Sequence, residues 1–172
     1  LSLLASGMAV AHDGAGPYTI ANLPLERVAE RVYVVHATQR LPNKENAGFA
    51  NNPGFVVAAN GVIVVDPGSS VQIGKELLKK IRTVTDKPVI AVLNTHVHGD
   101  HFLGNYAMRL VYPKVPIYAH VQAIEHMNSG EGEDWFNLFM RMTEGAIAGT
   151  KVVAPNIGLS GNEILNLGGV DL

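Results

Sequence analysis

The feature that most constrains this chain is an apolar strand pattern that leads directly into a cluster of histidines. Residues 89–93, Val-Ile-Ala-Val-Leu, precede residues 95–101, Thr-His-Val-His-Gly-Asp-His, which contain three of the chain's seven histidines. His96 and His98 are two positions apart, so extended or loop backbone can direct both imidazoles to the same side. Imidazoles in this arrangement can share one metal ion. The pattern therefore predicts a metal site at the end of a strand.

The end of the same segment predicts a second metal ion. Asp100 and His101 follow His98 too closely to join the first pair. They reach a neighbouring ion if the backbone turns at Gly99, which has no side chain to obstruct the turn. Two ions a few ångströms apart form a clamp suited to hydrolysis. The alternative interpretation is surface histidines without a metal, but four ligand-type residues in six positions seldom have a purely structural use.

The composition limits how such a metal would be held. The chain of 172 residues contains no cysteine, which leaves histidine and carboxylate as metal ligands. Hydrophobic residues make up 47% and charged residues 16%, as expected of one globular domain and not of a disordered chain. The formal net charge of -2 and the absence of a basic stripe argue against nucleic acid as a partner.

The start of the chain is similar to the rear of a signal peptide. Apolar residues 1–8 are followed by Ala-Val-Ala at residues 9–11, a pattern that predicts cleavage before His12. The segment is far shorter than the ~20 apolar residues that a membrane-spanning helix needs, and no other stretch is long enough. We therefore expect a signal-peptide remnant at 1–11, a mature domain at 12–172 without a membrane span, and a periplasmic or secreted protein.

Four further segments predict strands. Apolar runs at residues 55–59 and 62–66 are joined by an Asn-Gly pair, a strong hairpin signal because both residues tolerate the positive φ of a type I′ turn. Both runs are nearly continuous in apolar residues, so we expect cover on both faces of the sheet. Other strands are expected at residues 31–36 and 115–119.

Helical spacing of apolar residues predicts three helices. The first follows Ser70, which can cap it. Its apolar face consists of Leu77, Leu78, Ile81 and Val84. A second helix is expected to begin around His101 and to run through Met108. The third carries an aromatic and methionine stripe of Trp135, Phe136, Phe139 and Met142. We expect this stripe to pack in the core, with the lining of a substrate pocket as the alternative.

At residues 96–105 the chain resembles a known family. His-x-His-x-Asp-His after a strand, continued by Phe-Leu-Gly-Asn, is similar to the signature of the metallo-β-lactamase-fold hydrolases. The resemblance implies an α/β fold, an αββα sandwich built from two similar halves with the metal ions at one edge between them. This chain would supply the first half and the start of the second.

The resemblance also implies roles for individual side chains. His96 and His98 would bind the first metal ion, Asp100 and His101 the second, and Asp100 would also orient the nucleophile. Asp66, at the end of a predicted strand, resembles an acidic residue that the family places near the metal loop but usually outside the ligand set. Its expected role is to hydrogen-bond and orient that loop. The alternative is an ordinary turn aspartate.

The family's ligand set is only partly present in these residues. Its third histidine for the first ion, its bridging carboxylate and its final histidine have no counterpart that we can locate before Leu172. Each ion therefore has two protein ligands, where zinc normally takes three or four. We expect a C-terminally incomplete domain whose metal binding is weak or absent in this chain alone.

The remaining polar segments are expected to have ordinary roles. His12, His36, His120 and His126 do not match the family's pattern, and we interpret them as packed or surface histidines. The Asn-rich loop of residues 41–53 is either a substrate contact at the mouth of the site, as the resemblance implies, or a polar surface connection.

The sequence thus predicts a metal-dependent hydrolase of a small-molecule substrate, with two zinc ions in the complete enzyme and iron as the alternative metal. The ions would lower the pKa of water from ~15.7 towards ~7, and the resulting hydroxide would attack an ester, thioester, lactone or β-lactam. Alkylsulfatases of the same fold stay open. A mononuclear iron oxygenase acting on persulfides shares the motif, and a non-catalytic half-domain is a third interpretation. The oligomeric state is left open.

Overall fold

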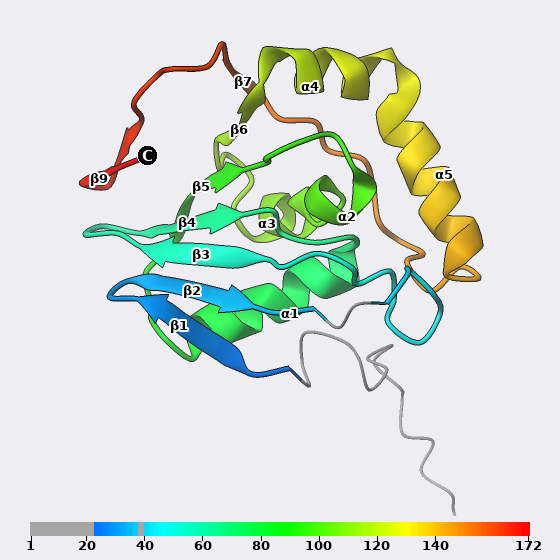
Figure 1. Ribbon diagram of the computed structural model, residues 1–172, viewed down its shortest axis with the longest axis horizontal. Helices are drawn as coiled ribbons and strands as arrows, with labels where there is room; N and C mark the ends of the chain where they lie inside the picture. Colours follow the sequence, from blue (N-terminus) through cyan, green and yellow to red (C-terminus); the bar gives the residue numbers. More distant parts are fainter. Residues whose placement is uncertain (1–22, 38–39) are drawn as a thin grey trace, which may run out of the picture.

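Figure 1 shows the computed structural model of the chain, which describes residues 23–37 and 40–172. The predicted signal-peptide remnant at residues 1–11 and the predicted cleavage point before His12 lie outside the described residues. From residue 23 onward the chain builds one large sheet with helices packed against it, as expected of an α/β architecture (Figure 1).

The sheet has seven strands whose spatial order follows the chain. Strands β1 to β4 pair antiparallel, whereas β4 to β7 pair parallel. A separate hairpin contains β8 and β9. The strands are Leu25–Ala29 (β1), Val32–Val35 (β2), Gly54–Val57 (β3), Val62–Val65 (β4), Val89–Leu93 (β5), Ile117–His120 (β6), Ile157–Leu159 (β7), Asn166–Leu167 (β8) and Val170–Asp171 (β9).

Helices make the crossovers between the parallel strands. Helix α1 connects β4 to β5, α2 and α3 connect β5 to β6, and α4, η2 and α5 connect β6 to β7. The helices are Val71–Arg82 (α1), Gly99–Phe102 (α2), Asn105–Val111 (α3), Val121–His126 (α4), Met127–Glu131 (η2) and Gly132–Met142 (α5). Within the described residues, none of these helices combines the length and apolar character needed to cross a bilayer.

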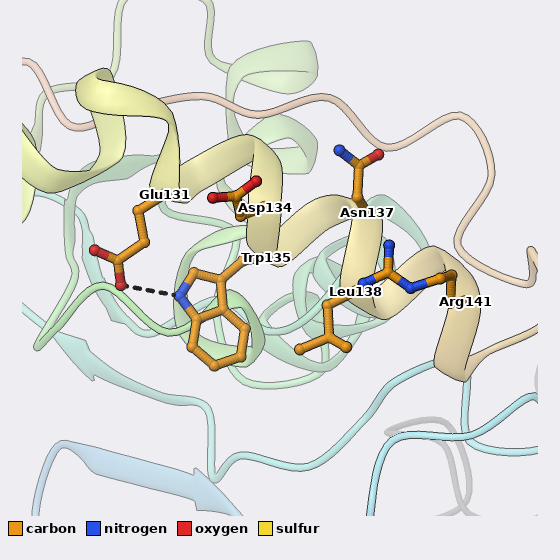
Figure 2. Close-up of a pocket in the computed structure, with 6 residues that line it drawn as sticks. All are labelled: Glu131, Asp134, Trp135, Asn137, Leu138 and Arg141. Carbon is orange, nitrogen blue, oxygen red and sulfur yellow. Dashed lines mark hydrogen bonds between the residues drawn. The ribbon is translucent and has the colours of Figure 1, made fainter.

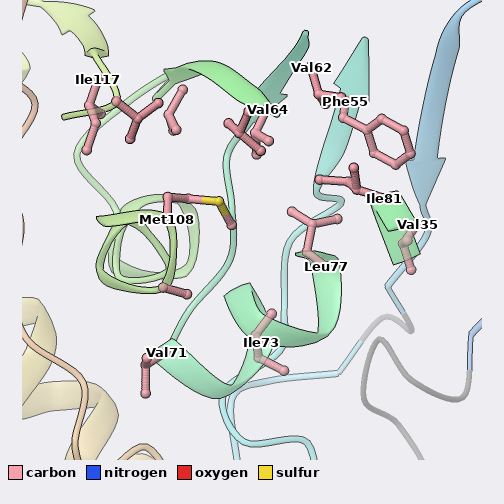
Figure 3. Packing of buried hydrophobic residues seen from close by; sticks show 14 of the residues in the cluster. Val35, Phe55, Val62, Val64, Val71, Ile73, Leu77, Ile81, Met108 and Ile117 are labelled. Atoms are coloured by element: carbon pink, nitrogen blue, oxygen red, sulfur yellow. The ribbon is translucent and has the colours of Figure 1, made fainter. Parts of the chain in front are cut away.

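The main core lies between one face of the sheet and helices α1 and α3. Helix α1 begins at a capped N-terminus, because Ser70 Oγ accepts a hydrogen bond from the Ile73 backbone N–H at 3.2 Å, as predicted. Burial of each large aliphatic side chain here contributes roughly 1.5–3 kcal/mol. Figure 3 shows the packing of Val35, Phe55, Val62, Val64, Val71, Ile73, Leu77, Ile81, Met108 and Ile117.

The opposite face of the sheet carries a smaller cluster. Ala58, Ile63 and Ala91 are buried there, and Leu167 and Val170 of the β8–β9 hairpin pack against them. The middle strands therefore have apolar neighbours on both sides. This arrangement agrees with the continuous apolar runs of β3 and β4.

The hairpin between β3 and β4 forms, but its predicted turn type is wrong. Val57 pairs with Val62, and the Ala58 N–H donates to the Gly61 carbonyl at 2.8 Å, so Ala59 and Asn60 are the central residues. Neither Asn60 nor Gly61 has a positive φ. Glycine is required for another reason: a Cβ at residue 61 would stand 2.2 Å from Ile90 Cγ2.

The expected strand boundaries differ from the observed ones. Residues 25–29 form β1, a strand that the sequence did not predict. Strand β1 is an edge strand whose side chains are mostly exposed, so it lacks the apolar alternation that reveals a half-buried strand. The strand expected at 115–119 is Ile117–His120, which moves His120 from the loop into the strand.

The helix expected from His101 to Met108 is also different. It begins at Gly99 and is interrupted by a turn at residues 103–104, which separates α2 from α3. Helix α1 ends at Arg82, so Val84 packs against the main core from the segment after the helix. The first helical position, residue 99, is a glycine because α5 leaves little room for a side chain there. A Cβ at residue 99 would stand 3.1 Å from the Trp135 Cβ.

A substitution at Gly74 tests how closely α1 approaches α3. A Cβ at residue 74 would stand 2.6 Å from the Ala107 Cβ and 2.8 Å from the Gly104 carbonyl oxygen. Gly74→Ala must therefore push α1 away, and we expect the free energy of unfolding to fall by about 2 kcal/mol although alanine favours helix. Lys75→Ala, at the exposed neighbouring position, is the control and should change stability by less than ~0.5 kcal/mol. Urea denaturation compares them; equal midpoints would contradict the close approach.

Candidate metal centre

The histidine segment lies at the edge of the sheet where two parallel strands end. Strand β5 ends at Leu93, and residues 94–98 lead into α2. Because β4 is the parallel neighbour of β5, with Val65 opposite Leu93, the residue after β4 comes to the same edge. That residue is Asp66, whose backbone N–H donates to the Leu93 carbonyl at 2.9 Å.

The Asp66 carboxylate organises this edge. It is only 5% exposed and accepts three hydrogen bonds from the histidine segment. Oδ1 accepts from the Thr95 backbone N–H at 2.8 Å, and Oδ2 accepts from the Thr95 hydroxyl at 2.7 Å. Oδ2 also lies 2.8 Å from His101 Nδ1. Asp66 therefore hydrogen-bonds the loop in the way that the sequence predicted.

These contacts determine which ring nitrogen of two histidines carries a proton. The Thr95 hydroxyl has one proton and gives it to Asp66, so it can only accept from His96 Nδ1, which lies 2.9 Å away. A carboxylate likewise only accepts, so His101 Nδ1 donates to Asp66. Both histidines are thus held as Nδ1–H donors. Nε2 of His96 is left for a ligand, whereas Nε2 of His101 faces Asp100 Oδ2 at 3.3 Å and would give up its proton and this contact to bind a metal ion.

The four predicted ligands lie close together. The ring centroids of His96 and His98 are 4.6 Å apart, and those of His96 and His101 are 4.0 Å apart. Asp100 Oδ2 is 3.3 Å from His101 Nε2. The structure therefore brings together all four side chains that the motif predicts as ligands, and Asp66 hydrogen-bonds to one of them, His101.

The electrostatics of the cluster follow from this crowding. Burial alone would lower the pKa of His101, but hydrogen bonds to Asp100 and Asp66 outweigh it and raise the pKa to about 9. Burial and the charges of His101 and His98 lower the pKa of His96. Burial would raise the pKa of Asp100, but its hydrogen bond to His101 lowers it.

The four candidate ligand side chains have the chemistry of a metal site, although they are few. Imidazole nitrogens with the second nitrogen hydrogen-bonded, together with a carboxylate, are the ligands that zinc and iron take in proteins without thiolates. Across the described ranges 23–37 and 40–172, no group of three or more such side chains has the geometry to hold one ion by itself. The assignment of His96 and His98 to one ion and Asp100 and His101 to another stays a prediction.

Two buried amides behind the loop were not assigned a role from the sequence. Asn94 Nδ2 donates to Asn105 Oδ1 at 3.2 Å, and Asn105 Nδ2 donates to Asn94 Oδ1 at 2.7 Å. Asn94 Nδ2 also reaches the His101 carbonyl at 3.3 Å, and Asn105 Nδ2 the Val153 carbonyl at 2.9 Å. The pair therefore fastens the end of β5 to α2 and α3. Their proximity to the motif was the only signal in the sequence.

The Asn-rich loop of residues 41–53 contacts the site through the backbone of Asp66. Asn51 Nδ2 donates to the Asp66 carbonyl at 2.9 Å. Asn46 is buried, and its side chain bonds the backbone of Asn43, Leu41 and Gly48 within the loop. The loop thus has a structural role at Asp66, and a contact with substrate stays a prediction.

The stripe of α5 packs in the core as expected at Trp135, Phe136 and Phe139, whereas its fourth member, Met142, is not part of that cluster. Phe139 is buried in a cluster with Phe102 and Leu103, and Trp135 packs against the same cluster. The Trp135 ring also lies beside the metal motif, with its centroid 4.8 Å from that of His98. Helical spacing predicted the packing, whereas the neighbourhood of His98 required the tertiary structure.

The remaining described histidines lie outside the cluster. His36 pairs with Glu26 at 2.9 Å, and His126 Nδ1 donates to Glu131 Oε2 at 2.8 Å. His120 accepts a hydrogen bond from the Gln122 backbone at the start of α4. These three have polar partners on the protein surface or at a helix end, which agrees with their interpretation as packed or surface histidines.

Comparison with known proteins identifies the family. Residues 47–169, which include Asp66 and the whole histidine segment, match the family model described as the metallo-beta-lactamase superfamily. The chain belongs to this superfamily. Its sheet and helices are a partial metallo-β-lactamase fold.

Relatives and solved structures of this superfamily are similar over part of their length. A probable metallo-hydrolase of Streptococcus pyogenes serotype M6 is 30% identical over 101 residues, which cover 54% of this chain and 42% of that protein. A linear primary-alkylsulfatase of a Pseudomonas species is 41% identical over 50 residues, 29% of this chain and 10% of that protein. The chain therefore spans less than half the length of the curated relatives that it matches.

Two solved structures show the same fold. A metallo-β-lactamase from Pontibacter korlensis superposes with a TM-score of 0.60 at 16% identity, covering 87% of this chain and 58% of that one. A double mutant of the sec-alkyl sulfatase PisA1 superposes with a TM-score of 0.62 at 18% identity, covering 94% of this chain and 30% of that one. At these identities the superpositions support the fold alone.

Asn105 tests the amide pair behind the loop. Asn105→Ala removes the donor that Asn94 Oδ1 and the Val153 carbonyl share, which leaves a buried amide oxygen unpaired, so we expect the free energy of unfolding to fall by about 2 kcal/mol. Asn128→Ala, at an exposed position, is the control and should cost less than ~0.5 kcal/mol. Chemical denaturation measures both. A loss at residue 105 no larger than at residue 128 would contradict a tightly coupled pair.

Proposed function

We propose that this chain belongs to a metal-dependent hydrolase whose metal ligands include His96, His98, Asp100 and His101. The observation that carries the proposal is the hydrogen bonding around Asp66, which engages Nδ1 of His101 directly and Nδ1 of His96 through Thr95, so that Nε2 is the atom each ring can offer to a metal ion. Membership of the superfamily and the similarity to a probable metallo-hydrolase support it.

Two zinc ions in the complete enzyme are the proposed cofactors. Bound zinc supplies a water of lowered pKa and polarises the bond to be cleaved. In this chain, Asp66 orients the His101 ring by accepting a hydrogen bond from its Nδ1. Asp66 also accepts from the Thr95 hydroxyl, and that hydroxyl oxygen in turn accepts from His96 Nδ1 and orients the His96 ring. Asp100, beside His101 Nε2, accepts a hydrogen bond from the attacking water and orients it.

The proposed substrate is a small molecule with an ester-type bond. Carboxylic esters, thioesters, lactones and β-lactams all present a carbon that water can attack. The local similarity to a linear primary-alkylsulfatase adds sulfate esters to this class. We also propose export to a periplasm or to the exterior, on the strength of the Ala-Val-Ala pattern at residues 9–11.

An iron oxygenase is the second candidate, because two histidines and one carboxylate also form the usual ligand set of non-haem iron. Metal analysis separates the two functions. One iron per chain together with oxygen consumption in the presence of a persulfide would replace the hydrolase, whereas two zinc ions and no oxygen consumption support it. A non-catalytic half-domain predicts equal thermal stability with and without zinc.

Loss of predicted ligands tests the hydrolase directly. In the full-length protein, His96→Ala and Asp100→Ala should each lower zinc content and reduce hydrolysis of ester, thioester and β-lactam probes by at least about 100-fold, because each removes a ligand. His36→Ala, which removes a histidine outside the cluster, is the control. Wild-type metal content and activity in both ligand variants would refute the proposal.

Asp66→Asn tests the orienting network separately from the ligands. The amide can accept at one atom only, so either Thr95 or His101 loses its acceptor, and we expect zinc affinity to fall about 10–100-fold. Competition with a chromogenic chelator measures the affinity in the full-length protein. Asp86→Asn, at an exposed carboxylate, should leave it unchanged. Equal affinities of the two variants would mean that Asp66 does not orient the histidines.

A further inference from the structure

Helix α5 carries a pocket next to the metal motif. The pocket has a volume of 510 Å³ and is lined by Glu131, Asp134, Trp135, Asn137, Leu138 and Arg141. Trp135 and Leu138 are three residues apart on the helix and project from the same side of it (Figure 2). They give the pocket one apolar side, and the other four lining side chains are polar.

The orientation of the Trp135 ring is fixed by hydrogen bonds to preceding residues. Its Nε1–H donates to Glu131 Oε1 at 3.3 Å, one helical turn earlier (Figure 2). Glu131 Oε2 in turn accepts from His126 Nδ1 at 2.8 Å. The five-residue spacing of His126 and Glu131 spans the wide turn η2, where Gly130 has a φ of 118°. The ring is therefore oriented by a chain of two hydrogen bonds.

The same ring connects the pocket with the predicted ligands. Its centroid is 4.8 Å from that of His98, and the two planes are tilted by 46°. On the backbone side, a Cβ at residue 99 would stand 3.1 Å from the Trp135 Cβ, so the start of α2 packs directly on the base of this side chain. A molecule that reaches the histidines from the α5 side therefore passes over Trp135.

We propose that this pocket binds the alkyl or acyl chain of the substrate, a proposal that rests on the hydrolase function above. Trp135 and Leu138 provide apolar surface for an uncharged chain. The two carboxylates Glu131 and Asp134 outnumber the one cation, Arg141, among the lining residues, which disfavours an anionic group in the pocket and directs the polar, reacting end of the substrate to the histidines. Trp135 is then a determinant of chain length, and Glu131 is a positioning residue that acts through it.

Tryptophan fluorescence tests binding independently of turnover. Trp135 is the single tryptophan among the 172 residues, so the part of the full-length protein's emission that is lost in Trp135→Phe reports on the pocket. In the full-length metal-loaded protein, octanoate should shift the emission in a saturable way and acetate at the same concentration should not. Trp135→Phe should abolish the signal. A signal that persists in Trp135→Phe, or an equal response to acetate and octanoate, would overturn the pocket assignment.

A matched pair of leucine variants tests whether the apolar side of the pocket contacts the ligand chain. Leu138→Ala removes apolar surface from the pocket and should weaken octanoate binding about tenfold. Leu110→Ala, at an exposed position on α3, should leave binding unchanged. Equal octanoate affinities of the two variants would contradict a chain lying on Leu138.

Chain-length dependence of turnover tests the role of Trp135 and Glu131. With p-nitrophenyl acetate, butyrate and hexanoate, kcat/KM of the wild-type protein should rise with chain length, and Trp135→Ala should remove most of the rise through KM. Glu131→Ala should raise KM for the hexanoate ester several-fold, and Glu131→Gln, which keeps an acceptor for Trp135, should restore it. Identical chain-length profiles in the wild-type and Trp135→Ala proteins would overturn the inference.

The outcomes separate this inference from the proposed function. Metal-dependent hydrolysis without an octanoate response at Trp135 would overturn the pocket and leave the hydrolase standing. A saturable octanoate response with no metal-dependent hydrolysis of any probe would overturn the hydrolase and leave the pocket as an alkyl-chain site.

Discussion

The site depends on one carboxylate that joins two strand ends. Asp66 follows β4 and accepts three hydrogen bonds from residues that follow β5, so the pairing of these strands fixes the histidine segment. That pairing depends in turn on burial, because Val64 and Val92 are fully enclosed in the core under α1 and α3. The hydrogen-bonded orientations of the His96 and His101 rings are therefore set by the packing of the sheet. A change in register between the strands would move the carboxylate and alter both rings together.

The sequence predicted the parts of the site that are local. His96, His98, Asp100 and His101 lie within six positions, so their proximity follows from the chain itself. The role of Asp66 could be expected only through the family resemblance, because it is 29 residues from Thr95. The Asn94–Asn105 pair and the contact of Trp135 with His98 depend on how α3 and α5 pack. No periodicity in the sequence reports such contacts between separate elements.

The fold was predicted best where burial produced a clear pattern. The continuous runs of β3, β4 and β5 were identified because both sides of these strands are enclosed. Strand β1 was missed because an exposed edge strand needs no apolar alternation. The Asn-Gly turn was assigned the wrong type because local preference gave way to a tertiary demand, the close approach of Gly61 to Ile90. Local preference decides a turn only when no neighbouring element restricts it.

The corner at Gly130 has a consequence for which side chains lie beside the metal motif. Its left-handed backbone ends one helical segment and redirects the chain into α5, which descends beside the metal motif (Figure 1). A residue inserted or deleted at this corner would rotate α5 by about 100° and present a different set of side chains to His98. The ligand-bearing loop after β5 would be untouched. A change at this corner would therefore alter the side chains that α5 presents beside the motif, while the residues of the motif itself stay the same.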